Sequence, residues 1–119
     1  MTHNQKVGLS TTQLAMVLDN IPAGITVIDS RGHILYYNSY CSRFVDRKPE
    51  YIGKDLRYCH QKPESVEKIE GILSALNEGK LKEFYYETER SGSKLGVTVS
   101  PFFVDGKKIG FIQCFSVIR

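Results

Sequence analysis

The chain has 119 residues, a length that supports one domain with a single modest hydrophobic core. Hydrophobic residues make up 41% of it and charged residues 24%, which excludes a disordered or fibrous protein. The net charge of +3 comes from Lys and Arg residues that are scattered and form no basic stripe, so direct binding to nucleic acid is not expected.

The N-terminal part of the chain predicts a short helix after a polar tail. Residues 1–9 are expected to form a flexible tail, and Ser10 and Gln13 have the spacing of a capping box. A flanking helix is therefore predicted over residues 10–21, before a domain core over residues 22–119. Its apolar side chains either fill a groove of the same chain or pair with a second copy, and they are Leu14, Val17, Leu18 and Ile21.

A β-hairpin is predicted directly after this helix. Residues 25–28 and 34–37 are rich in the β-branched and aromatic side chains that suit strands. Asp29 and Gly32 lie between the two runs and suit a tight turn. Two shorter segments follow the hairpin, at residues 40–45 and 51–56.

The longest helix of the chain is predicted to begin at Pro63, because the first turn of a helix does not need the N–H that proline lacks. Gly79 is a suitable residue to end it. Its apolar residues form one stripe toward the core, and they are Val66, Ile69, Ile72, Leu73 and Leu76.

Three further strands are predicted over residues 82–89, 95–104 and 108–118. Asp105-Gly106 is a strong signal for a hairpin turn between the last two of them. Pro101 indicates a sheet edge or a bulge at its position. These strands are expected to be sequential antiparallel neighbours, with the helices covering one face of the sheet. The sequence therefore predicts an α+β fold.

The cysteines and the remaining motifs exclude several chemistries. Cys41, Cys59 and Cys114 are odd in number and widely spaced, so neither a disulfide framework, a zinc ribbon nor covalent haem attachment is expected. Reduced thiols, the absence of a signal core and the lack of a spanning apolar run predict a cytoplasmic protein without membrane contact. The chain has no carboxylate pair, phosphate loop or nucleophile elbow, and we do not expect an enzyme.

Three short motifs lie in a characteristic order along this chain. Across the first two strands the pattern D-x-x-G-x-I-x-x-x-N is matched by Asp29, Gly32, Ile34 and Asn38. Gly53-Lys54-Asp55 precedes the long helix, and Gly110 lies near the start of the final strand. With this order and spacing, residues 10–119 resemble a PAS domain. The pair Cys59-His60 is similar to a Cys-His-Pro step found before the long helix in a bacterial PAS subgroup.

The resemblance implies five antiparallel strands, helices on one face and a cavity between the two layers. Such cavities bind haem, flavin or small metabolites, or hold only side chains, and the fold alone does not decide which. In light-sensing relatives a reactive Cys follows the motif glycine by three residues, and here Leu56 occupies that position, so a flavin–cysteine adduct is not expected. Gln113 lies on the strand where flavin-binding relatives place a Gln, but its offset from Gly110 differs by one.

Haem is the leading cofactor hypothesis, ahead of non-covalent flavin. Relatives that bind haem use a His in the middle of the long helix, and this chain has Lys68 near that position. His60 is then the candidate axial and metal ligand, with a Cys59 thiolate or a plain loop role as the alternatives. The expected cavity lining is Phe44, Leu56, His60, Ile69, Leu73, Val97, Phe111 and Gln113.

The expected role is that of a sensory module in signal transduction or transcription regulation. Ligand binding would change the sheet and the N-terminal helix, and a partner or an output domain would read that change. In this family flanking helices often form homodimers, so the helix over residues 10–21 is the expected dimer contact. The alternative is a ligand-free PAS module that acts by dimerisation and protein interaction alone.

Overall fold

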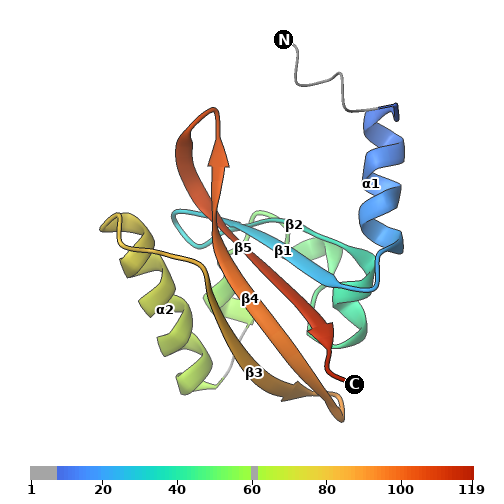
Figure 1. Ribbon diagram of the computed structural model, residues 1–119. Helices are drawn as coiled ribbons and strands as arrows, with labels where there is room; N and C mark the ends of the chain where they lie inside the picture. The colour runs from blue at the N-terminus through green and yellow to red at the C-terminus, as the bar shows by residue number, and fades with distance from the viewer. Residues whose placement is uncertain (1–7, 60–61) are drawn as a thin grey trace.

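The computed structural model describes residues 8–59 and 62–119, and it places five antiparallel strands in a single sheet (Figure 1). The helix α2 and the short 3-10 helices pack on one face of this sheet. The strand order in space is β2-β1-β5-β4-β3. This confirms the predicted α+β architecture. The strands are β1 (Gly24–Asp29), β2 (Ile34–Tyr37), β3 (Phe84–Arg90), β4 (Ser93–Val104) and β5 (Lys107–Val117).

The helices alternate with loops around this sheet. The first helix, α1 (Thr11–Asn20), begins with the predicted capping box, in which Ser10 Oγ accepts from the Gln13 N–H and Gln13 Oε1 accepts from the Ser10 N–H. No residue of α1 is buried. Within the described ranges, neither α-helix has the length and apolar character needed to cross a membrane. The remaining helices are three short 3-10 helices and the long helix, namely η2 (Ser39–Arg43), η3 (Pro49–Tyr51), η4 (Leu56–Cys59) and α2 (Pro63–Asn77).

The core lies between α2 and the inner face of the sheet. Strand register decides which side chains face it, because paired residues in an antiparallel sheet point to the same side. Thr26 pairs with Gln113 and Gln113 with Val99, so all three side chains lie on the inner face. The apolar stripe of α2 meets this face and is buried at Ile69, Ile72, Leu73 and Leu76.

The C-terminal end of β4 and the N-terminal end of β5 extend beyond the sheet as a two-stranded hairpin (Figure 1). Pairing between β3 and β4 ends at Val99, so β4 has an open edge from that point. Pro101 lies in this part of the strand, where its missing N–H costs no inter-strand bond on that side, and a bulge follows between Phe102 and Phe103. Of the two predicted alternatives, the edge position is found at Pro101, and the bulge lies further along the strand.

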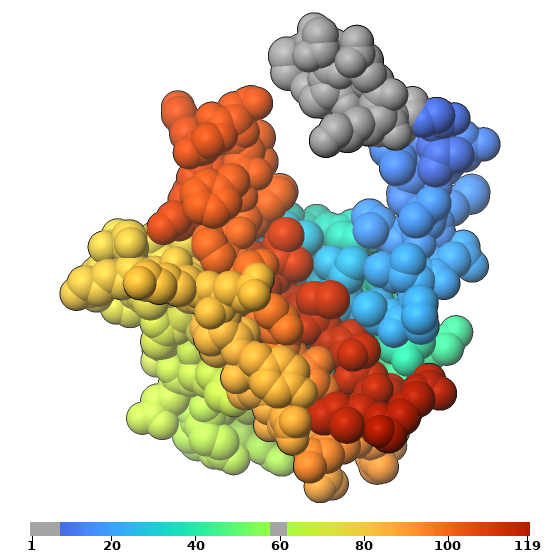
Figure 2. Space-filling view, in the orientation of Figure 1, coloured from blue at the N-terminus to red at the C-terminus, as the bar shows by residue number. Residues whose placement is uncertain are grey.

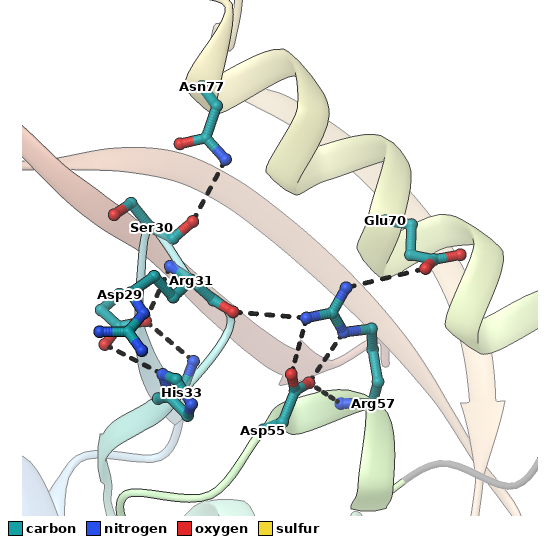
Figure 3. Close-up of polar contacts among 8 residues, drawn as sticks. All are labelled: Asp29, Ser30, Arg31, His33, Asp55, Arg57, Glu70 and Asn77. Atoms are coloured by element: carbon teal, nitrogen blue, oxygen red, sulfur yellow. Dashed lines mark hydrogen bonds and ion pairs between the residues drawn. The ribbon is translucent and has the colours of Figure 1, made fainter.

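The turn between β1 and β2 is held by local hydrogen bonds and by close packing (Figure 3). Asp29 Oδ1 accepts hydrogen bonds of 2.9 Å from the backbone N–H groups of Arg31 and His33. Gly32 has a φ of +95°, and a side chain there would also meet Leu73 Cδ1 at 3.1 Å. The backbone conformation therefore favours glycine, and the Leu73 side chain of α2 leaves little room for a larger residue.

An ion pair fastens this turn to the segment before α2 (Figure 3). Arg57 Nη2 lies 2.6 Å from Asp55 Oδ2, and Arg57 Nε donates to Asp55 Oδ1 at 2.9 Å. The same guanidinium donates to the Arg31 carbonyl at 3.4 Å and lies 3.7 Å from the Glu70 carboxylate. The bidentate arginine–carboxylate pair has a defined geometry, so it orients the guanidinium that contacts both the turn and α2.

Replacing Asp55 by asparagine is expected to make the stability of the domain less dependent on pH in the acid range. Hydrogen bonds from Arg57 hold the pKa of the Asp55 carboxyl below the ordinary value of about 3.9. Such a carboxyl stabilises the fold above its unfolded-state pKa, and the contribution disappears as the pH falls through the folded-state pKa. The urea midpoint of Asp55→Asn should be lower than that of the wild type at pH 7, and the gap should narrow below about pH 4.

The matched control for this prediction is Asp105→Asn. Asp105 is an exposed carboxylate in the turn between β4 and β5, outside the cluster around Arg57. Its removal should leave the shape of the stability profile against pH as in the wild type. Parallel profiles for the wild type and Asp55→Asn would contradict the role assigned to the ion pair.

Candidate ligand-binding site

A cavity of about 820 Å³ lies between the inner face of the sheet and the N-terminal part of α2. Its volume falls in the range of roughly 300–1,000 Å³ that is typical of small-molecule sites. The apolar part of its wall is Phe44, Val45, Ile69, Ile72, Leu95, Val97 and Phe115. The polar part includes Thr26, Arg47, Lys68, Tyr86, Arg90 and Gln113, with Lys62, Glu64, Glu89 and Ser91 exposed at its rim.

Aromatic rings form one side of the cavity. Phe44 and Phe115 meet edge to face, with ring centroids 5.9 Å apart. Tyr40 packs behind them, 5.4 Å from Phe44 and 6.4 Å from Phe115. Rings in such tilted arrangements attract one another beyond their simple burial. This side of the site is therefore a firm apolar surface against which a flat or aliphatic group can pack.

Arg47 provides a buried positive charge at the cavity wall. The residue is only 7% exposed, although it lies in the loop between η2 and η3. Its Nε donates to Thr26 Oγ1 at 3.3 Å, and its Nη1 donates to the carbonyl of Asp46 at 3.0 Å. Thr26 Oγ1 in turn lies 3.3 Å from the sulfur of Cys41, whose pKa is raised by burial.

A polar chain crosses the cavity wall at β3 and β5. Gln113 Nε2 donates to the hydroxyl of Tyr86 at 3.2 Å. The ammonium of Lys68 on α2 lies 3.7 Å from the centre of the Tyr86 ring, a cation–π distance. Burial raises the pKa of the Tyr86 hydroxyl, while the Gln113 bond and the charges of Arg90 and Arg47 act in the opposite direction. Tyr86 is therefore a neutral phenol that links the sheet to α2 at neutral pH.

The residues predicted from sequence to line the cavity fall into three groups. Phe44, Ile69, Val97 and Gln113 line the cavity. Leu56, Leu73 and Phe111 are buried but lie outside the lining, because they fill the end of the core beneath the β1–β2 turn. There the Leu56 N–H donates to the Gly32 carbonyl and Phe111 pairs with Ile28. His60, the predicted axial and metal ligand, lies outside the described residues.

Sequence reasoning missed a buried polar pair in the wall of the cavity, Thr26 and Arg47. Arg47 stands in the run Asp46-Arg47-Lys48-Pro49, which has the composition of a solvated loop. Nothing in this local pattern indicates burial. Thr26 carried a weak signal, because it alternates with Ile25 and Val27 and shares the inward parity of Ile28 in the predicted strand.

Comparison with known proteins identifies the family to which this fold and cavity belong. A family model described as PAS domain matches residues 14–115. The chain therefore belongs to the PAS domain family, the class of sensory and signal-transduction domains that its sequence motifs resemble. Comparison with curated proteins gives no significant match.

Solved structures with the same fold come from several organisms. A C-terminal domain from Streptococcus mutans has a TM-score of 0.78 at 22% identity, with 93% of this chain and 87% of that chain covered. A sensory box sensor histidine kinase from Vibrio cholerae has a TM-score of 0.63 at 18% identity, covering 91% of each chain. The PAS domain of the quorum-sensing receptor RpfR from Cronobacter turicensis, solved with BDSF, has a TM-score of 0.61 at 14% identity, covering 84% and 97%.

Proposed function

We propose that this PAS domain is a non-catalytic sensor that binds a small organic molecule in the cavity between its sheet and α2. The observation that carries the proposal is the cavity itself, which combines a large volume, a rigid aromatic side and a few convergent polar groups. Sites with this composition are typical of small-molecule recognition. The structure of the RpfR domain in complex with BDSF supports the use of the same fold for ligand binding.

A cavity-filling variant tests the proposal. Val97 is 4% exposed and lines the cavity from β4, whereas its neighbour Thr98 points to the opposite face of the sheet. Octanoate and 1-octanol serve as probes, because each presents an apolar body of the kind that the aromatic side accepts. Isothermal titration should show at least about tenfold weaker binding of both probes to Val97→Phe than to Thr98→Phe. Equal binding to the two variants, or binding of neither probe to the wild type, would contradict the proposal.

Haem is one specific form of this proposal. Its iron would need an axial ligand such as His60 or the Cys59 thiolate, and neither side chain is among those that the structure describes. The part of the lining that is described contains no imidazole, thiol or thioether. An absorption spectrum of the purified protein tests this form directly. A Soret band that is lost in His60→Ala would support haem, a flavin spectrum would support non-covalent flavin, and a spectrum of protein alone would exclude both.

We also propose that ligand binding in the cavity changes the position of α1, and that β1 transmits this change. Thr26 contacts Arg47 in the cavity wall and lies on β1, the strand that follows α1. Asn38 ties the end of α1 to the same region, because its Nδ2 donates to the Leu18 carbonyl at 2.6 Å. A ligand that moves Arg47 and Thr26 would therefore shift the attachment of α1. The occurrence of this fold in sensor histidine kinases supports an output domain as the reader of that shift.

The proposed partner for α1 is a second copy of this chain. Figures 1 and 2 show α1 projecting from the body of the domain, toward the same side as the β4–β5 hairpin but separate from its tip. Its apolar side chains are left uncovered, with Leu14 40%, Met16 58% and Val17 45% exposed. Leu14 and Val17 are one helical turn apart and share a face of α1, and an exposed apolar face of this kind marks an interaction site. Pairing of two such helices would cover it.

Replacing Leu14 and Val17 together by glutamate is expected to abolish this dimer. Two carboxylates on the paired surface would be desolvated next to apolar side chains, which strongly disfavours association. Light scattering over a range of protein concentrations should show a dimer for the wild type and a monomer for the double variant. Thr12→Glu, an exposed polar position on the same helix, is the matched control and should remain dimeric. A wild type that stays monomeric at high concentration would remove α1 from the proposal.

A further inference from the structure

The buried guanidinium of Arg47 lacks an acidic partner within the described ranges 8–59 and 62–119. The Nε of Arg47 donates to the Thr26 hydroxyl, and its Nη1 donates to the Asp46 carbonyl. Both of these acceptors are neutral. None of the ion pairs formed by the described residues includes Arg47. Arginine has five N–H donors and stays protonated, so among the described residues three of these donors have no hydrogen-bond partner and the charge has no acidic one.

Such an arrangement is costly unless something else supplies the missing charge. Buried charges in proteins are paired or hydrogen-bonded, because removal of an ion from water is strongly unfavourable. The carboxylates at the cavity, Asp46, Glu64 and Glu89, are all exposed, and the Asp46 carboxylate accepts a hydrogen bond from the Tyr51 hydroxyl. The cavity thus combines a buried cation with an apolar wall and keeps its acidic groups in solvent.

We propose that the ligand of this cavity is a small carboxylic acid in its ionised form, with its carboxylate bound by Arg47 and its apolar body packed on Phe44 and Phe115. This inference rests on the proposed function and specifies the ligand class of that site. A planar carboxylate matches the fork geometry of a guanidinium and carries one charge, equal to that of its partner. Lys68 and Arg90 also line the cavity but neither is buried, so the single buried positive charge of Arg47 matches the single charge of a carboxylate.

The experiment separates the charged head from the apolar body. Octanoate and 1-octanol share a chain and differ only in the head group, so titration of both into the wild type and into Arg47→Met isolates the contribution of the guanidinium. We expect wild type to bind octanoate at least about tenfold more tightly than 1-octanol, and Arg47→Met to lose this preference while it still binds 1-octanol. Lys68→Met removes an exposed cation from the same cavity and should retain most of the preference.

The outcomes distinguish failure of the ligand class from failure of the site. Equal affinity of the wild type for octanoate and 1-octanol, or an unchanged octanoate affinity in Arg47→Met, would overturn the carboxylate assignment and leave the cavity intact as a binding site. No binding of either probe would overturn the proposed function and this inference with it. Monooctyl phosphate distinguishes the two kinds of anion, since tighter binding of this probe than of octanoate would replace the carboxylate by a phosphate.

A stability measurement gives an independent check that does not depend on probe affinity. Because no acidic side chain of the described residues compensates the buried charge of Arg47, Arg47→Met is expected to unfold at a temperature no lower than that of the wild type. Octanoate should then raise the unfolding temperature of the wild type more than that of the variant. A variant that is clearly less stable than ligand-free wild type would show that Arg47 serves the fold, and would overturn its assignment as a ligand-binding group.

Discussion

Replacing Gly110 by alanine is expected to remove a large part of the stability of this domain. An added Cβ would overlap the carbonyl oxygen of Ile28 on the neighbouring strand and would lie 2.9 Å from the Cα of Asp29. These are backbone atoms in the middle of a paired sheet, so they cannot move aside as the end of a flexible side chain would. The expected loss is about 3 kcal/mol or more, a large fraction of the roughly 5–15 kcal/mol that holds a typical domain.

Urea denaturation followed by circular dichroism measures this loss. The matched control is Gly71→Ala, because Gly71 lies in the interior of α2 and a Cβ there would meet nothing within 4 Å. Alanine is the better helix former, so this control should gain about 0.5–1 kcal/mol. If Gly110→Ala unfolds at the wild-type urea concentration, the close approach of β1 and β5 at this point is wrong.

Replacing Asn38 by alanine is the second change with a large expected effect. The side chain is fully buried, and its Oδ1 accepts from the N–H groups of Ile25 and Cys41 at 2.9 and 3.3 Å. Its Nδ2 donates to the carbonyls of Leu18 and Ala23 at 2.6 and 2.9 Å. Alanine would leave several of these buried backbone groups without a partner, and we expect a loss of about 3 kcal/mol.

The position of the lost contacts makes a second readout available. Because Asn38 is bonded to the last part of α1, hydrogen exchange in that helix should accelerate more than exchange in β4 or β5 when both are compared under native conditions. Asn20→Ala is the matched control, since Asn20 is exposed and its side chain donates to the Met16 carbonyl of the same helix. That control should change stability by less than about 0.5 kcal/mol. Equal losses for the two variants would contradict the anchoring role of Asn38.

The fold was largely predictable because its signals are local. The capping box at Ser10, the turn at Asp29 and Gly32 and the Asp105-Gly106 turn each mark a boundary by chemistry that acts within a few residues. The family motif also has a physical explanation in the structure. Its Asp and Gly shape the β1–β2 turn, its Asn joins α1 to η2, and Gly110 permits the close approach of two strands.

The candidate site was less predictable because it depends on contacts between distant segments. Leu56, Leu73 and Phe111 have the apolar character of cavity-lining residues, yet the chain brings them together beneath the β1–β2 turn and not at the cavity. Arg47 is the opposite case, a residue whose sequence neighbours are charged and suggest a solvated loop. In the folded chain it is buried, contacts Thr26 and lines the cavity. The local sequence predicts neither the packing of these three apolar residues outside the cavity nor the burial of Arg47.

The central claim is that a small molecule binds in the cavity beneath the sheet, and NMR mapping tests it most directly. In two-dimensional ¹H–¹⁵N spectra recorded during a titration with octanoate, the largest shifts should come from amides that surround the cavity. These lie around Thr26, Arg47, Val97 and Gln113 and along the N-terminal part of α2. Val97→Phe should suppress these shifts. Shifts confined to α1 or to the outer face of the sheet, or no shifts at all, would contradict the account.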